Sequence, residues 1–320
     1  MNALPRVIGV LLILAAILMA LGRVPDVPAE GLVERWAPLP SDFIAVRGMV
    51  VHVRDEGPRN DPEPVVLLHG TAASLHTWNG WTRFLKTQRR VIRFDLPGFG
   101  LTGPFEGEYD ADDYTGDAYA RFVLDVLDVL DVQRAVLGGN SMGGEIAWRT
   151  ATLAPERVSK LVLVDASGLD VKPLDVPLGF VIASLPVLST LSQSITPRDI
   201  VANSLASIYG NPAKVTPELV DRYYQLLLRE GNRKALTQRL RQLETGAAAA
   251  RLANIRQPTL ILWGGLDRLI PPAAGVELQR RISGSQLVMF DTLGHVPQEE
   301  DPAATVKPVL AFLGLADLAP

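Results

Sequence analysis

One glycine-rich turn combines the residue types that nucleophilic catalysis requires. Gly139-Asn140-Ser141-Met142-Gly143 fits the pattern G-x-S-x-G; a short apolar run at 134–137 precedes it, and a helical pattern begins at Glu145. Glycines around a serine remove the Cβ atoms that would clash in a strained strand-to-helix turn. The turn would lift the Ser141 hydroxyl above the sheet, and the backbone N–H of Met142 would face a developing oxyanion from a helix N-terminus. We therefore predict that Ser141 is a nucleophile.

A serine hydroxyl needs a neighbouring base to act as a nucleophile, and the chain has four histidines. His295 follows a predicted strand late in the chain, where a side chain can reach the serine turn. His52 alternates with two valines and is expected to face solvent. His69 is expected to hydrogen-bond the backbone of the loop that follows it, and His76 lies near that loop. We predict that His295 is the base.

Two aspartates compete to orient the imidazole. Asp267 follows the apolar strand predicted at 259–263, and Asp165 ends the strand that follows the serine turn. Side chains at the carboxyl ends of parallel strands meet at one edge of a sheet, so either carboxylate could reach His295. We predict Asp267 as the acid, because Ser141, Asp267 and His295 then follow the chain order serine, acid, histidine. Asp165 stays open as the alternative.

An oxyanion hole needs two N–H donors close to the nucleophile. Met142 supplies one of them by its position directly after the serine. Thr71 supplies the other, since Gly70 before it permits a tight turn that aims its backbone N–H. We predict an oxyanion hole of Thr71 and Met142, and we expect His69, Gly70 and His76 to border the substrate pocket.

Short apolar runs and helical patterns alternate along most of the chain, which predicts a parallel sheet with helices on both faces. The pattern changes at 169–252, where helical periodicity dominates and no buried strand is evident. We interpret 169–252 as a helical cap inserted between the two parts of the core, 42–168 and 253–316. Strands are expected at 43–46, 49–54, 65–68, 91–94, 134–137, 158–164, 259–263 and 286–290.

Together these residues resemble the α/β-hydrolase superfamily. The resemblance implies a mostly parallel, eight-stranded sheet with a helical cap, and it assigns Ser141, Asp267 and His295 as the catalytic triad. The elbow is also similar to that of the meta-cleavage-product hydrolases, which split C–C bonds, but His69-Gly70-Thr71-Ala72 departs from their His-Gly-x-Gly-Pro-Gly pattern. The matching segments are His69-Gly70, Asp95–Gly100, Gly139–Gly144, Asp165-Ala166, Gly264–Asp267 and Gly294-His295.

The activity that we predict is hydrolysis of small carboxylic esters through an acyl-enzyme, as in serine esterases and lipases. C–C bond hydrolysis by the same triad is the alternative, and a catalytically silent pocket-binding protein is a third possibility. No cofactor or metal is expected; the absence of cysteine rules out a cysteine-based zinc site. The net charge of −4 gives no reason to expect nucleic acid as a partner. The oligomeric state stays open.

The N-terminus differs in kind from the rest of the chain. Residues 7–22 carry no charge, and a helix of this length would span about 24 Å, slightly short of a ~30 Å hydrocarbon core. We predict a signal-anchor helix at 1–23 that binds a membrane, with the catalytic domain on the extracytoplasmic side. Secretion after signal cleavage is the alternative. Residues 24–41 have several prolines and are interpreted as a linker.

Overall fold

A computed structural model of the chain describes residues 22–185, 189, 193–244 and 246–317. Its centre is an eight-stranded sheet in the order β1-β2-β4-β3-β5-β6-β7-β8. β2 runs antiparallel to both of its neighbours, and the remaining pairs are parallel. This arrangement confirms the predicted fold class. The strands are β1 (Ser41–Val46), β2 (Met49–Glu56), β3 (Val65–Leu68), β4 (Val91–Phe94), β5 (Ala135–Asn140), β6 (Val158–Val164), β7 (Thr259–Gly264) and β8 (Gln286–Phe290).

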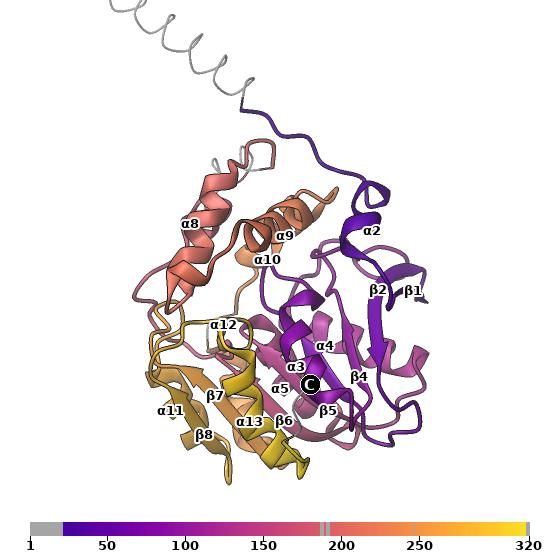
Figure 1. Ribbon diagram of the computed structural model, residues 1–320, viewed down its shortest axis with the longest axis vertical. Helices are drawn as coiled ribbons and strands as arrows, with labels where there is room; N and C mark the ends of the chain where they lie inside the picture. Colours follow the sequence, from indigo (N-terminus) through magenta and orange to yellow (C-terminus); the bar gives the residue numbers. More distant parts are fainter. Residues whose placement is uncertain (1–21, 186–188, 190–192, 245, 318–320) are drawn as a thin grey trace, which may run out of the picture.

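The central strands are apolar because helices cover both faces of the sheet (Figure 1). Alternate residues of one strand enter different cores: Leu161 and Leu163 of β6 belong to one apolar cluster, and Val162 and Val164 belong to the other. The first cluster is closed by α4 (Gly116–Val129), α5 (Met142–Leu153) and α11 (Ala273–Arg281), and the second by α3 (Asn79–Leu85) and α13 (Pro302–Leu313). Short helices η1 (Leu75–Trp78), η2 (Pro155–Arg157) and α12 (Pro297–Glu300) complete the core.

Between β6 and β7 the described residues form helices and add no strand to the sheet. In Figure 1, α8, α9 and α10 lie together above the end of the sheet. We keep the name cap for residues 169–252; its division from the core as a separate domain stays a prediction. Its helices are α6 (Leu178–Ser184), α8 (Arg198–Ile208), η3 (Pro212–Lys214), α9 (Pro217–Leu227), α10 (Asn232–Arg241) and η4 (Ala247–Asn254).

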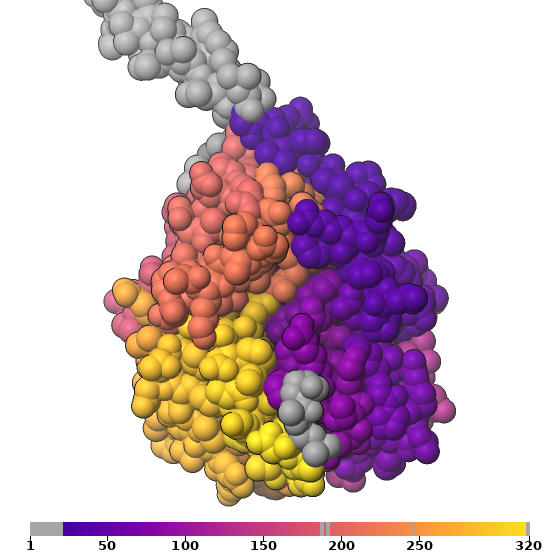
Figure 2. All heavy atoms as spheres, in the orientation of Figure 1, coloured from indigo at the N-terminus to yellow at the C-terminus, as the bar shows by residue number. Residues whose placement is uncertain are grey.

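The segment before β1, interpreted above as a linker, packs on the cap and contains a helix, α2 (Glu30–Trp36). Leu32 of α2 is buried against Leu101 of the core and Leu226 of α9. The Trp36 indole N–H donates to Gln225 Oε1 at 2.9 Å. In the space-filling view the indigo N-terminal residues lie directly against the orange cap (Figure 2). This segment therefore connects the core to the cap instead of acting as a free spacer.

One structural finding contradicts the predicted membrane-anchored location. No helix within the described residues is long and apolar enough to cross a membrane. The longest of them, α4, has 14 residues, a length of about 21 Å against a hydrocarbon core of ~30 Å. The predicted anchor itself, residues 1–23, lies outside the described residues except for Gly22 and Arg23. We therefore withdraw the anchored, extracytoplasmic location, its secreted alternative and the membrane as a partner.

Candidate active site

Ser141 occupies the turn between β5 and α5 in a strained backbone conformation, with φ 55° and ψ −119°. A non-glycine residue adopts a positive φ only where the surrounding structure enforces it. Here the enforcement comes from close packing of two glycines. A Cβ on Gly139 would lie 2.2 Å from the Gly143 carbonyl carbon, and a Cβ on Gly143 would lie 2.2 Å from the Leu68 oxygen. The turn can therefore form only with glycine at these two positions.

His295 and Asp267 form a buried hydrogen-bonded pair next to this turn. His295 Nδ1 lies 2.7 Å from Asp267 Oδ2, and the two residues are 3% and 1% exposed. The other carboxylate oxygen of Asp267 accepts the backbone N–H groups of Leu269 and Ile270, each at 2.9 Å. These contacts hold the carboxylate in one orientation, so that Nδ1 of His295 carries the proton and Nε2 is the basic nitrogen.

Two buried polar residues that the sequence analysis did not single out support the loop that carries His295. Asn140, next to the serine, donates its side-chain N–H to the His295 carbonyl oxygen at 2.9 Å. Glu300 accepts the backbone N–H of Gly294 at 2.9 Å and that of Gly210 in the cap at 3.0 Å. The only signal in the sequence was their position: Asn140 lies inside the elbow motif and Glu300 lies five residues after His295.

Asp165, the alternative acid, lies beside the pair but is not hydrogen-bonded to the histidine. Its Oδ1 accepts the Gly264 backbone N–H at 2.9 Å, whereas its buried Oδ2 has no hydrogen-bond partner within the described part of the chain. Burial, followed by the nearby charge of Asp267, raises the pKa of the Asp165 carboxyl well above its usual value. The raised pKa favours the protonated form of Asp165, and the geometry favours Asp267 as the partner of His295.

Asp165, Asp267 and His295 also have the spacing of metal ligands, since one ligand atom of each lies within 4.8 Å of the others. His295 Nδ1 and Asp267 Oδ2 already share a proton at 2.7 Å, and a metal ion would have to displace that proton. The site therefore suits proton transfer better than metal binding.

The two residues predicted to form the oxyanion hole lie side by side. The Thr71 hydroxyl is directed at the Met142 sulfur, at 3.6 Å. Met142 is the first residue of α5, so its backbone N–H has no acceptor within the helix. The Thr71 backbone N–H likewise has no protein acceptor among the described residues. Two N–H donors are thus available next to Ser141, and their role as an oxyanion hole stays a prediction.

His69 supports the oxyanion loop as expected, but it does not line the cavity. It accepts the Leu96 backbone N–H at Nε2, at 2.9 Å, and its Nδ1 lies 2.8 Å from the Gly70 oxygen. These two bonds define the tautomer: Nδ1 donates to Gly70. Burial lowers the pKa of His69, so that the neutral ring acts as a fixed link between two loops.

His76 and His52 lie away from the cavity. His76 Nε2 contacts the Trp36 oxygen at 2.8 Å, and burial lowers its pKa to about 3. The expectation that His52 faces solvent is wrong: it is fully buried, 2.7 Å from Asp95 Oδ2 and 2.9 Å from Ser41 Oγ. Alternation along a strand indicates which side chains share a face, but only the packing around β2 decides that both faces are covered.

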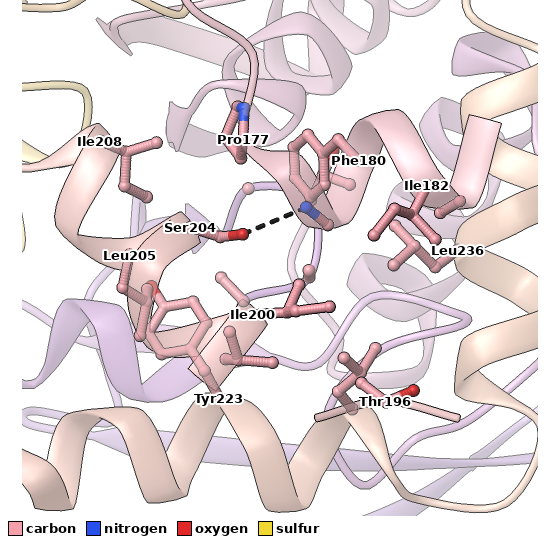
Figure 3. A pocket seen from close by; sticks show the side chains of 18 of the residues that line it. Pro177, Phe180, Ile182, Thr196, Ile200, Ser204, Leu205, Ile208, Tyr223 and Leu236 are labelled. Carbon is pink, nitrogen blue, oxygen red and sulfur yellow. Dashed lines mark hydrogen bonds between the residues drawn. The ribbon is translucent and has the colours of Figure 1, made fainter. Parts of the chain in front are cut away.

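Ser141 and His295 line the same cavity, which has a volume of about 340 Å³ and lies between the strand ends and the cap. Gly70 and Thr71 line it as well. Figure 3 shows the aliphatic and aromatic side chains that α6, α8, α9 and α10 direct toward it. The large apolar and aromatic residues around the cavity are Phe180, Ile182, Ile195, Ile200, Val201, Leu205, Ile208, Tyr223, Leu227, Leu236, Leu269 and Val296.

With the sheet order, the strained serine and the histidine–aspartate pair established, the chain can be placed among known proteins. A family model described as "alpha/beta hydrolase fold" matches residues 63–302. Because this is more than half of the 320 residues, the chain belongs to the alpha/beta hydrolase family.

Among its relatives is a 2-hydroxy-6-oxononadienedioate/2-hydroxy-6-oxononatrienedioate hydrolase of Comamonas testosteroni, which is 30% identical over 82% of this chain and 91% of that protein. A protein of the same name in Burkholderia vietnamiensis is 32% identical over 82% of this chain and 90% of its own length. The crystal structure of a membrane phospholipase A, described as a bacterial virulence factor, is 26% identical with a TM-score of 0.71, covering 97% of this chain and 95% of that one. The family and these relatives establish a hydrolase, and the relatives are named for different substrates.

Proposed function

We propose that this protein is a serine hydrolase that cleaves carboxylic esters with a neutral, apolar acyl group. The observation that carries the proposal is that Ser141 and His295 face one cavity whose lining is almost wholly aliphatic or aromatic. Such a lining stabilises an acyl chain through the hydrophobic effect and offers few hydrogen bonds to a polar one. The similarity to a phospholipase A, an ester hydrolase by definition, supports the same choice.

The proposed reaction assigns one role to each site residue. Ser141 Oγ attacks the acyl carbonyl while His295 Nε2 takes its proton, and Asp267 stabilises the imidazolium that forms. The backbone N–H groups of Thr71 and Met142 hold the oxyanion of the tetrahedral intermediate. His295 then returns the proton to the leaving alkoxide, which leaves Ser141 as an acyl ester. A water molecule, deprotonated by His295, attacks that ester and releases the acid with Ser141 restored.

Hydrolysis of a C–C bond is the second candidate, and the two relatives named as dienedioate and trienedioate hydrolases favour it. The same serine and histidine could serve that reaction. A dioate, however, brings two carboxylates, and burying a carboxylate in an apolar cavity is costly unless a cation receives it. The composition of the cavity therefore favours the ester.

The test compares the two reactions in one preparation. We would measure kcat/KM for p-nitrophenyl esters of graded acyl length beside a synthetic 2-hydroxy-6-oxo-dienoate, and map the peptide labelled by a fluorophosphonate probe. We expect ester turnover that rises with acyl length and a label on Ser141. Faster cleavage of the dienoate than of every ester would establish the second candidate. No turnover and no label would indicate a binding protein.

A further inference from the structure

One cation, Arg233 of α10, is the only lysine or arginine among the described residues that line the cavity. It is 5% exposed. A guanidinium in this place could receive the carboxylate of an anionic substrate, because its planar N–H groups match carboxylate geometry. What Arg233 already binds therefore decides which acyl groups the cavity can take.

Most of the N–H groups of Arg233 are engaged by the segment that precedes α2. Its Nε and Nη2 donate to Asp26 Oδ1 at 3.0 and 2.6 Å. Nη2 also donates to the Val24 oxygen at 2.8 Å, and Nη1 to Thr196 Oγ1 at 3.3 Å. A guanidinium has five N–H groups, and these four bonds use most of them. The charge of Arg233 is thus neutralised by Asp26 within the protein.

Asp26 is held in place by backbone bonds on both sides of it. The Val24 N–H donates to the Ser194 oxygen at 2.8 Å, and the Val27 N–H donates to the Leu228 oxygen at 2.7 Å. The Glu230 N–H returns a bond to the Val27 oxygen at 2.9 Å. The carboxylate is therefore pre-organised against the cap, and a substrate carboxylate would have to displace it from Arg233.

We propose that Asp26 is a specificity-determining residue: by occupying Arg233, it makes the cavity reject acyl groups that carry a carboxylate and accept neutral ones. This inference rests on the proposed ester hydrolysis. It assigns to the pre-α2 segment a part in substrate selection, although that segment lies more than 100 residues before Ser141 in the chain.

The experiment uses pairs of esters that differ only at the end of the acyl chain. The p-nitrophenyl hexanoate, octanoate and decanoate would be compared with the mono-p-nitrophenyl esters of adipic, suberic and sebacic acid. The readout is the ratio of kcat/KM for the charged ester to that for the neutral ester of the same length. In the unaltered protein we expect this ratio to be about 0.01 or below, because a buried unpaired carboxylate is costly.

Asp26→Asn removes the charge that neutralises Arg233 and leaves only a neutral amide oxygen as its acceptor. A substrate carboxylate can displace that weaker acceptor, so the ratio should rise by about tenfold or more. The double variant Asp26→Asn/Arg233→Gln should return the ratio to its original value. Asp221→Asn is the matched control: Asp221 also pairs with arginines, Arg198 of the cap and Arg35 of α2, but it does not line the cavity. It should leave the ratio unchanged.

Two results would overturn the inference: equal turnover of charged and neutral esters by the unaltered protein, or an Asp26→Asn ratio equal to that of the control. If Asp26→Asn fails to fold, Asp26→Ala takes its place, because it also removes the carboxylate that neutralises Arg233. It should raise the charged-to-neutral ratio in the same way, and a ratio equal to that of the control would overturn the inference. Absence of turnover for every ester would instead refute the proposed ester hydrolysis.

Discussion

Two buried histidine–aspartate pairs lie at different places in this molecule, and the distance between the imidazole nitrogen and the carboxylate oxygen is the same in both. His295 and Asp267 are 2.7 Å apart, as are His52 and Asp95. The second pair even has a serine, because Ser41 Oγ lies 2.9 Å from His52 Nε2. Ser41, His52 and Asp95 therefore repeat the residue types of the proposed triad.

The surroundings separate the two groups. Ser141 and His295 line a cavity, whereas Ser41 and His52 are absent from its lining. Ser41 Oγ also accepts the Arg54 Nε–H at 2.8 Å, and Asp95 accepts the backbone N–H groups of Leu75 and Leu101 at 2.7 and 2.8 Å. The second group joins loops to the sheet and gives no access to a substrate. A hydrogen-bonded serine, histidine and aspartate can thus act as a catalytic site only where a strained turn and a cavity give a substrate access to the serine.

The largest expected effect comes from the two serines. Ser141→Ala should lower kcat for a p-nitrophenyl ester by about 10⁴-fold or more, because triad members act as a unit. Ser41→Ala, the matched control, should keep kcat within about threefold of the unaltered protein, since Ser41 does not line the cavity. Steady-state kinetics measures kcat of both variants, after circular dichroism has shown that each of them is folded. The opposite ranking would make Ser41, not Ser141, the nucleophile.

The two aspartates give the next contrast. Asp267→Asn should lower kcat by up to ~10⁴-fold, because an amide favours the wrong imidazole tautomer. Asp95→Asn should leave kcat per folded molecule close to that of the unaltered protein. Active-site titration with the fluorophosphonate probe supplies the folded, reactive fraction. A comparable loss of kcat in both variants would contradict the separation between a catalytic and a structural pair.

Folding stability should distinguish the two pairs in the opposite sense to kcat, because Asp95 is expected to support the fold and not the reaction. Asp95→Asn should lower the free energy of unfolding by about 3 kcal/mol, the usual cost of breaking a buried pair by removing one partner. Burial alone would raise the pKa of Asp95, but His52 and the other facing histidines lower it overall. A carboxylate with a lowered pKa stabilises the fold above its unfolded pKa of about 3.9, and that contribution fades as the pH falls below it. Urea unfolding at several pH values should therefore show the two proteins converging in acid; a constant difference would be contrary to this reasoning.

The smallest effect is expected at Asp165. Asp165→Asn should reduce kcat far less than Asp267→Asn, since Asn can still accept the Gly264 N–H. The raised pKa of Asp165 means that the folded state holds its proton more tightly than the unfolded state does. Folding stability from this group is present below its unfolded pKa and is lost as the pH rises toward its folded pKa. The variant should therefore gain stability relative to the unaltered protein as the pH rises above the unfolded pKa of about 3.9. If Asp165→Asn instead cost more activity than Asp267→Asn, Asp165 would be the acid.

Much of the sheet could be predicted from local pattern. The runs at 65–68, 91–94, 158–164 and 286–290 coincide with β3, β4, β6 and β8, because short apolar runs bounded by polar turns are typical of central strands. The turn at Ser141 could also be predicted from local sequence, since the strained serine and its flanking glycines lie within five residues. The family follows from these features, and the family match confirms it.

Long-range packing produced the features that the pattern could not predict. The burial of His52 depends on η1 and the loops around Asp95, and the helix α2 of the supposed linker is stabilised by its contacts with α9. The choice between Asp165 and Asp267 depends on one hydrogen bond to His295 across 28 residues of chain. The pairing of Asp26 with Arg233 spans 207 residues.

The sequence by itself determined the fold, the elbow and the candidate residues, because those depend on neighbours within a few positions. Only the tertiary structure decided which aspartate orients the histidine, which histidines are buried and what neutralises the cation of the cavity, because burial and charge pairing are properties of groups that meet only after the chain has folded.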